Sequence, residues 1–145
     1  MVKRLRENRK NKKGFTLVEL IVVIVIILVL AAVMVPSVLR YVEKANQANT
    51  KSDAATILVD IQAQVADLAT ESKTIPDSLT AGGVTVTKIT SEDKIVYKDK
   101  AIANFLMDDK GDISYFSYAD AKNNIVWKKA TGWDKVEKTD KNAEK

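Results

Sequence analysis

The chain contains neither cysteine nor histidine among its 145 residues. Without cysteine it can form no disulfide, thiolate nucleophile or sulfur-ligated metal centre. Without histidine it lacks the side chain that serves most often as a general base and as a transition-metal ligand. The sequence also contains no phosphate-binding loop, nucleophile elbow or dinucleotide fingerprint. We therefore expect a protein that is not an enzyme and holds no cofactor.

The positive charge of the chain is concentrated at its N-terminus. Residues 1–14 contain seven lysines and arginines and one glutamate, a net charge of +6, whereas the whole chain carries +4. The remainder therefore carries −2, which argues against strong binding of nucleic acid. A basic cluster before a membrane segment favours a cytoplasmic N-terminus.

A long apolar segment follows the basic cluster. Every residue from Leu20 to Val35 is apolar, and only Thr16 and Glu19 interrupt the segment that begins at Phe15. Roughly 20 apolar residues span a bilayer as a helix, and this segment lacks the polar face of a soluble helix. An ordinary secretory signal peptide is disfavoured, because its apolar region is shorter and because Ala31-Ala32 is a poor cleavage site.

The helical pattern continues beyond the apolar segment. Residues 37–71 contain neither glycine nor proline, and their apolar residues recur at helical spacing opposite a polar side. One helix is therefore expected from Phe15 to about Glu71, ending before Pro76. Its second half is predicted to pack through a stripe made of Ala55, Leu58, Val59, Ile61, Val65, Leu68 and Ala69.

After Pro76 the period of the apolar pattern changes to two, which predicts strands. Short connections favour an antiparallel sheet, so the expected class is α+β, a long N-terminal helix packed on a small antiparallel sheet. Strands are expected at 84–89, 94–97, 113–118 and 125–128. Residues 101–107 could form either a strand or a short helix, and residues 135–145 are expected to be a frayed tail. Packing on the sheet faces, rather than ligand binding, is expected of Tyr115, Phe116, Tyr118, Trp127 and Trp133.

One loop offers carboxylates to a metal ion. Asp108, Asp109 and Asp112 lie next to Gly111, which is faintly similar to a calcium site, but the spacing lacks the calcium-loop pattern. A solvated acidic turn is the favoured interpretation, and no metal is expected.

The junction of the basic and apolar segments resembles the class III signal peptide of type IV pilins and secretion pseudopilins. It reads Lys12-Lys13-Gly14-Phe15-Thr16-Leu17-Val18-Glu19. Glu19 and Pro36 stand at the family's spacing from Phe15. The resemblance covers residues 1–36 closely and the rest of the chain only in outline.

This resemblance implies that a prepilin peptidase cleaves between Gly14 and Phe15 and methylates the new amino group of Phe15. Gly14 suits a bend into a protease site, since it has no β-carbon. A carboxylate in an apolar helix costs about 2–3 kcal/mol or more and marks a functional position. In the family, the residue at the position of Glu19 neutralises the amine of the adjacent subunit and sets its axial register. In the monomer, Glu19 could instead reach water.

Pro36 removes a backbone hydrogen bond and is expected to kink the helix. The kink marks either the membrane boundary or a stretch that loosens in the filament. The expected organisation is a leader at 1–14, a membrane and filament-core helix at 15–36, an amphipathic helix at 37–72, a sheet head at 73–134 and a polar tail at 135–145.

The resemblance implies a structural subunit of a type IV pilus-like filament. Its expected partners are copies of itself, the prepilin peptidase, an assembly ATPase, an inner-membrane platform protein and, before assembly, the membrane. The precursor is expected in the cytoplasmic membrane and the mature subunit at the cell surface. The alternatives are a pseudopilin of a type II secretion or competence system, or a minor pilin that binds DNA or a surface ligand. The absence of cysteine favours a Gram-positive source or a pseudopilin.

Overall fold

The computed structural model describes residues 14–92, 95, 97 and 99–139, and contains one long helix followed by seven strands. The helix, α2, runs over Leu17–Thr70 and includes Pro36. These bounds lie close to those expected from the sequence. The chain divides into two compact units, Met1–Tyr41 and Val42–Lys145, so α2 contributes to both.

In the N-terminal unit the apolar side chains of α2 are exposed. The large ones between Leu17 and Val35 have exposed fractions of 47% to 74%. By length and composition α2 qualifies as a membrane-crossing helix. Apolar surface on this scale requires cover by lipid or by other protein.

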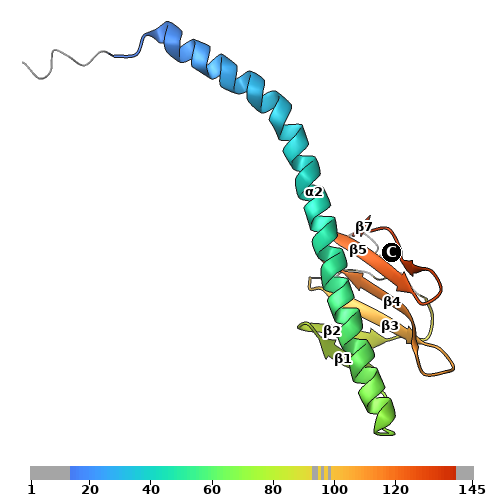
Figure 1. The fold of residues 1–145 in the computed structure, drawn as a ribbon. Helices are drawn as coiled ribbons and strands as arrows, with labels where there is room; N and C mark the ends of the chain where they lie inside the picture. The colour runs from blue at the N-terminus through green and yellow to red at the C-terminus, as the bar shows by residue number, and fades with distance from the viewer. Residues whose placement is uncertain (1–13, 93–94, 96, 98, 140–145) are drawn as a thin grey trace, which may run out of the picture. The chain divides into compact units, whose positions relative to one another are not determined.

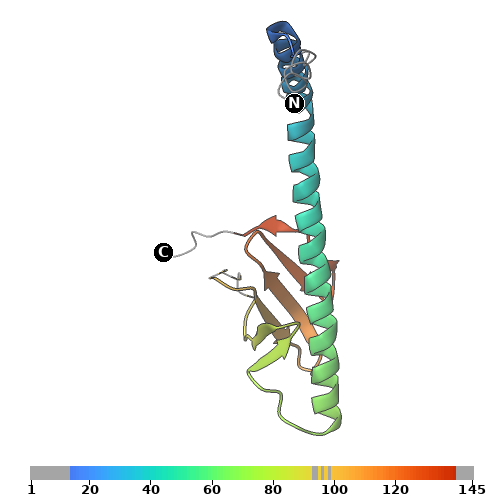
Figure 2. The same cartoon turned by 90° about the vertical axis from the view of Figure 1, so that its left-hand side faces the viewer.

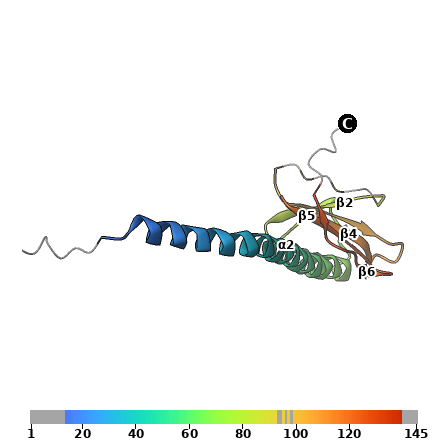
Figure 3. The same ribbon diagram turned by 90° about the horizontal axis from the view of Figure 1, so that it is seen from above.

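The C-terminal unit combines the second half of α2 with a seven-stranded sheet (Figure 1). The strands are β1 Ser78–Ala81, β2 Val84–Lys88, β3 Ile102–Met107, β4 Ile113–Ala119, β5 Asn123–Lys128, β6 Gly132–Trp133 and β7 Glu137–Lys138. Their order is β1-β2-β3-β4-β5-β6, and β7 pairs with β5. Figures 2 and 3 show this half of α2 lying along one face of the sheet. The expected α+β class is confirmed.

One strand pair departs from the expected antiparallel sheet. β2 and β3 are parallel, with Val86 opposite Ala103, whereas the other pairs are antiparallel. Residues 89–101 separate the two strands in the sequence, and about a dozen residues are long enough for the crossover that a parallel pair requires. The expectation that every pair is antiparallel is therefore wrong here.

Most expected strands form. Those at 84–89, 113–118 and 125–128 are confirmed as β2, β4 and β5, and the open segment 101–107 contains β3. The segment 94–97 lies partly outside the described residues, and its two described residues are not in a strand. β6 and β7, with two residues each, are too short for an alternating pattern to be recognised, whereas Ser78–Ala81 of β1 does alternate between exposed and buried residues. Because β7 pairs with β5, the expected fraying of the tail is wrong at Glu137–Lys138.

The hydrophobic core of the C-terminal unit lies between α2 and the sheet. The buried face of α2 is formed by Ala54, Ile57, Leu58, Ile61 and Val65. These side chains pack against residues of five strands, β1 to β5, including Val86, Phe105, Phe116 and Ile125. Phe116 also meets Trp133 edge to face at 6.2 Å between ring centroids, as expected for aromatic packing.

The predicted apolar stripe on α2 is partly wrong. Val59 is 65% exposed and Ala69 is also exposed. The buried face contains Ala54, Leu58, Ile61 and Val65. Because a helix has 3.6 residues per turn, residue 59 points about 100° away from residue 58 and so lies outside this face. An apolar residue next to a stripe in the sequence can thus be mistaken for a member of it.

A buried polar network fixes the β4–β5 turn to α2. Asp120 accepts hydrogen bonds from the Thr50 hydroxyl at 2.5 Å and from the backbone N–H groups of Lys122 and Asn123 at 2.7 and 2.8 Å. The Asn123 amide donates to the Thr50 hydroxyl at 3.1 Å. Thr50 and Asn123 are 1% and 3% exposed. Because buried polar groups must be hydrogen-bonded, these contacts fix how the turn meets the helix.

Candidate processing and assembly site

Gly14 and Phe15 lie immediately before α2. Neither has regular secondary structure, and Phe15 is 89% exposed. A β-carbon placed on Gly14 would meet no atom within 4 Å among the described residues. Packing among the described residues therefore gives no reason for a glycine at this position. The peptide bond between the two residues is accessible and non-helical, as a protease substrate must be.

Glu19 forms a reciprocal pair of hydrogen bonds with Thr16. The Oε2 atom of Glu19 accepts from the Thr16 backbone N–H at 2.9 Å, and the Glu19 N–H donates to the Thr16 hydroxyl at 3.2 Å. The Leu20 N–H donates to the Thr16 carbonyl at 3.2 Å and closes the first turn. This arrangement is a capping box, in which Thr16 caps the helix and Glu19 is its third residue.

The capping box explains how the helix begins at this point. The first N–H groups of a helix have no partner within it, and its N-terminal end carries partial positive charge. A carboxylate is stabilised there both as an acceptor and as an anion. In the sequence, Thr16 stands out only as an interruption of the apolar segment. The Thr-x-x-Glu spacing is the signal that identifies it as part of the site.

Pro36 and the acidic loop lie apart from this site along the chain. α2 continues through Pro36, and the expected kink stays a prediction. The acidic loop belongs to the C-terminal unit, whereas Pro36 and Glu19 belong to the N-terminal unit. Among the expected site residues, Gly14, Phe15 and Glu19 lie within the first turn of the helix and the chain that leads into it, while Asp108 and Asp112 meet in the acidic loop.

The acidic loop holds a lysine between its carboxylates. The ammonium of Lys129 lies 2.9 Å from Asp108 and 2.7 Å from Asp112, and Asp108 also accepts the backbone N–H groups of Lys110 and Asp112. These hydrogen bonds hold the pKa of Asp108 below its usual range, and the bond from Lys129 has the largest effect. The hydrogen bonds that Lys129 donates to Asp112 and Asp108 raise the pKa of Lys129 in turn. Among the described residues no cluster of three or more metal-ligating side chains occurs, and Lys129 is the partner of two of the loop's carboxylates.

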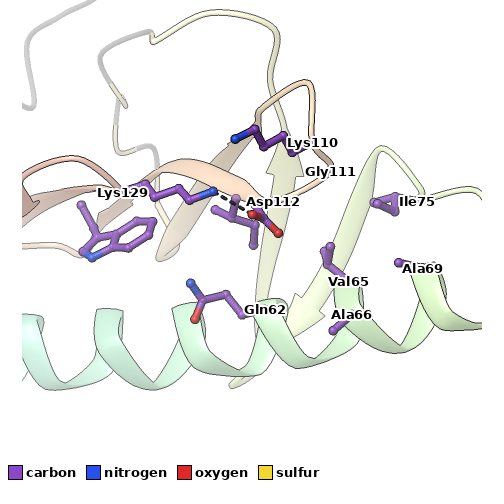
Figure 4. A pocket seen from close by; sticks show the side chains of 11 residues that line it. Gln62, Val65, Ala66, Ala69, Ile75, Lys110, Gly111, Asp112 and Lys129 are labelled. Carbon is purple, nitrogen blue, oxygen red and sulfur yellow. Dashed lines mark hydrogen bonds and ion pairs between the residues drawn. The ribbon is translucent and has the colours of Figure 1, made fainter.

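A groove of about 650 Å³ adjoins this loop (Figure 4). Its walls come from α2, including Gln62 and Val65, and from the β3–β4 turn and β5. Asp112 and Lys129, which both line the groove, are paired with each other.

Comparison with known families identifies the segment around the capping box. Residues 9–35 match the family model described as the prokaryotic N-terminal methylation motif. No curated protein and no solved structure matches the chain significantly. The motif indicates a structural protein that is processed by a prepilin peptidase and assembled into a filament, and with the apolar helix it fits a membrane-anchored precursor that later assembles at the surface. The match at residues 9–35 thus supports a class III signal peptide of the type IV pilin kind.

Proposed function

We propose that the chain is a structural subunit of a type IV pilus-like filament. A peptidase removes residues 1–14 by cutting between Gly14 and Phe15, and the amino group of Phe15 is then methylated. The observation that carries this proposal is the coincidence of the methylation motif with an accessible Gly14–Phe15 bond and an exposed apolar helix.

Cleavage changes the charge at the membrane surface. The leader carries a net +6, which holds the precursor with its N-terminus in the cytoplasm and its C-terminal unit outside. Removal of the leader leaves a single α-amino group at Phe15. Glu19 is its partner, in the same chain or in an adjacent subunit of the filament.

The apolar helix gains little hydrophobic free energy when it moves from lipid into a filament core, since lipid tails are equally apolar. Close packing of helices and pairing of the two charges therefore favour the assembled state. A charge left unpaired in an apolar core is costly, so the pair selects one axial register. Energy for extraction from the membrane comes from a separate cytoplasmic ATPase acting through a platform protein.

In this proposal the chain is organised as a leader at 1–14, a filament-core helix at 15–36, an amphipathic helix at 37–72, a head at 73–134 and a polar tail at 135–145. Pro36 marks the end of the filament-core helix.

A pseudopilin of a secretion or competence system is the second candidate, favoured by the absence of a cysteine-based loop in the head. A minor pilin that captures DNA is disfavoured by the net charge of −2 that remains after processing. Retention of the mature protein on immobilised DNA, with loss at raised salt, would support the DNA-binding candidate instead.

Electron microscopy of material sheared from the cell surface tests the main proposal. Abundant thin filaments that carry this chain are expected. Retention of the whole protein in the membrane fraction, with no filaments, would refute the proposal.

A further inference from the structure

The Thr16–Glu19 hydrogen bonds matter most while the subunit is still in the membrane. In hydrocarbon every polar group must find a partner within the protein, and a carboxylate is among the most costly groups to place there. The capping box supplies the Glu19 carboxylate with the Thr16 N–H and the Glu19 N–H with the Thr16 hydroxyl. Two backbone donors and one oxygen of the carboxylate thus have partners without a second molecule.

The same bonds also fix where the carboxylate lies. An N-cap residue is not helical itself and sets the point at which the helix begins, which here is Leu17. The Glu19 side chain bends back toward the N-terminal end and bonds to the amide of Thr16. Thr16 directly follows Phe15, the residue that carries the α-amino group after cleavage.

We propose that Thr16 is a positioning residue for Glu19. In the membrane-anchored subunit Thr16 holds the Glu19 carboxylate at the start of the helix until this carboxylate pairs with an α-amino group during assembly. The inference rests on the proposed function. A carboxylate accepts more than one hydrogen bond, so an amine can join it there. Since the side chain is already ordered, pairing costs less side-chain entropy than it would from a freely rotating glutamate.

Amide hydrogen exchange of the full-length precursor in detergent micelles, followed by NMR, tests the contact directly. The residue-16 amide is expected to be protected in the wild type and in Thr16→Ser, and to exchange at least several-fold faster in Glu19→Ala. The Glu19 amide is expected to lose protection in Thr16→Val, which keeps the shape of threonine without its hydroxyl. An unchanged exchange rate at residue 16 in Glu19→Ala would overturn the inference, whether or not filaments form.

Filament yield provides the functional test. Thr16→Val is expected to lower the yield about fivefold, the size of one capping interaction, with leader removal unchanged by mass spectrometry. Thr16→Ser, which keeps the hydroxyl, is expected to restore the yield. Normal yield from Thr16→Val would overturn the positioning role. Failure of the wild type to form filaments would instead count against the proposed function, while hydrogen exchange would still decide whether Thr16 holds Glu19.

Discussion

The two units of the chain use apolar side chains in opposite ways. In the N-terminal unit, the large apolar side chains between Leu17 and Val35 are about half exposed or more. In the C-terminal unit, the buried core residues are at most 8% exposed. The second unit therefore has a core of its own, whereas the first is incomplete until lipid or other copies cover it. Sites for processing and assembly are expected in the incomplete unit.

Polar groups differ between the units in a related way. Glu19 and Thr16 are exposed and bond to each other at the start of a helix. Thr50, Asp120 and Asn123 form a largely buried network between α2 and the sheet. The first pair is available to another molecule, while the second group stabilises the fold.

The largest effect is expected from Gly14→Val. A β-carbon at this position would meet no atom within 4 Å in the described part of the chain, but a β-branched side chain limits the bend that the peptidase needs. Leader removal and filaments should be lost, measured by mass spectrometry and electron microscopy, while the thermal unfolding of the C-terminal unit stays unchanged. Normal processing would show that the glycine is not read at this site.

Replacement of Glu19 should separate charge from capping. Glu19→Ala is expected to permit cleavage but to lower filament yield more than tenfold, since a buried amine without its partner costs about 3 kcal/mol or more. Glu19→Gln is the matched control, because glutamine also forms a capping box but carries no charge. It should fail in assembly as well. Wild-type yield from either variant would refute the register role.

A pair of substitutions on α2 tests the buried face. Ile61→Ala removes a fully buried side chain and is expected to lower the free energy of unfolding by about 2–5 kcal/mol. Val59→Ala, at a position 65% exposed, should change it by less than about 0.5 kcal/mol. Denaturant unfolding of the full chain in detergent measures both. Equal effects would contradict the assigned face.

Thr50→Val tests the polar network. It removes the hydroxyl that joins Asp120 to Asn123 and leaves the Asn123 amide without this acceptor, at an expected cost of about 1–3 kcal/mol. Thr56→Val is the control, since the Thr56 hydroxyl bonds only to the Ser52 carbonyl at the helix surface in the described structure. A smaller loss from Thr50→Val than from Thr56→Val would contradict a stabilising role.

The smallest effect is expected in the acidic loop. Lys129→Met should lower stability only slightly, because exposed ion pairs contribute little to the free energy of unfolding. The pKa of Asp108 is lowered in the folded protein. Its contribution to the free energy of unfolding is therefore fully present above the ordinary aspartate pKa and is lost as the pH falls through the pKa of the folded state. Calcium should not raise the melting temperature of the wild type. A clear calcium-dependent rise would restore the metal interpretation of Asp108, Asp109 and Asp112.

The sequence predicts the two units unequally. The long helix and the cleavage motif follow from local patterns, namely the apolar run and the order Gly14, Phe15 and Glu19. The parallel β2–β3 pair and the pairing of β7 with β5 depend on contacts between distant segments, which no local pattern encodes. Val59 was misplaced because neighbouring apolar residues on a helix lie about 100° apart. Thr16 was recognisable, since the capping-box spacing is local.

Mass spectrometry of this chain from sheared cell-surface filaments tests the central claim most directly. The account predicts a polypeptide that lacks residues 1–14 and begins with N-methylated Phe15. A surface-exposed chain that retains the leader, or one cleaved beyond the apolar helix, would contradict it.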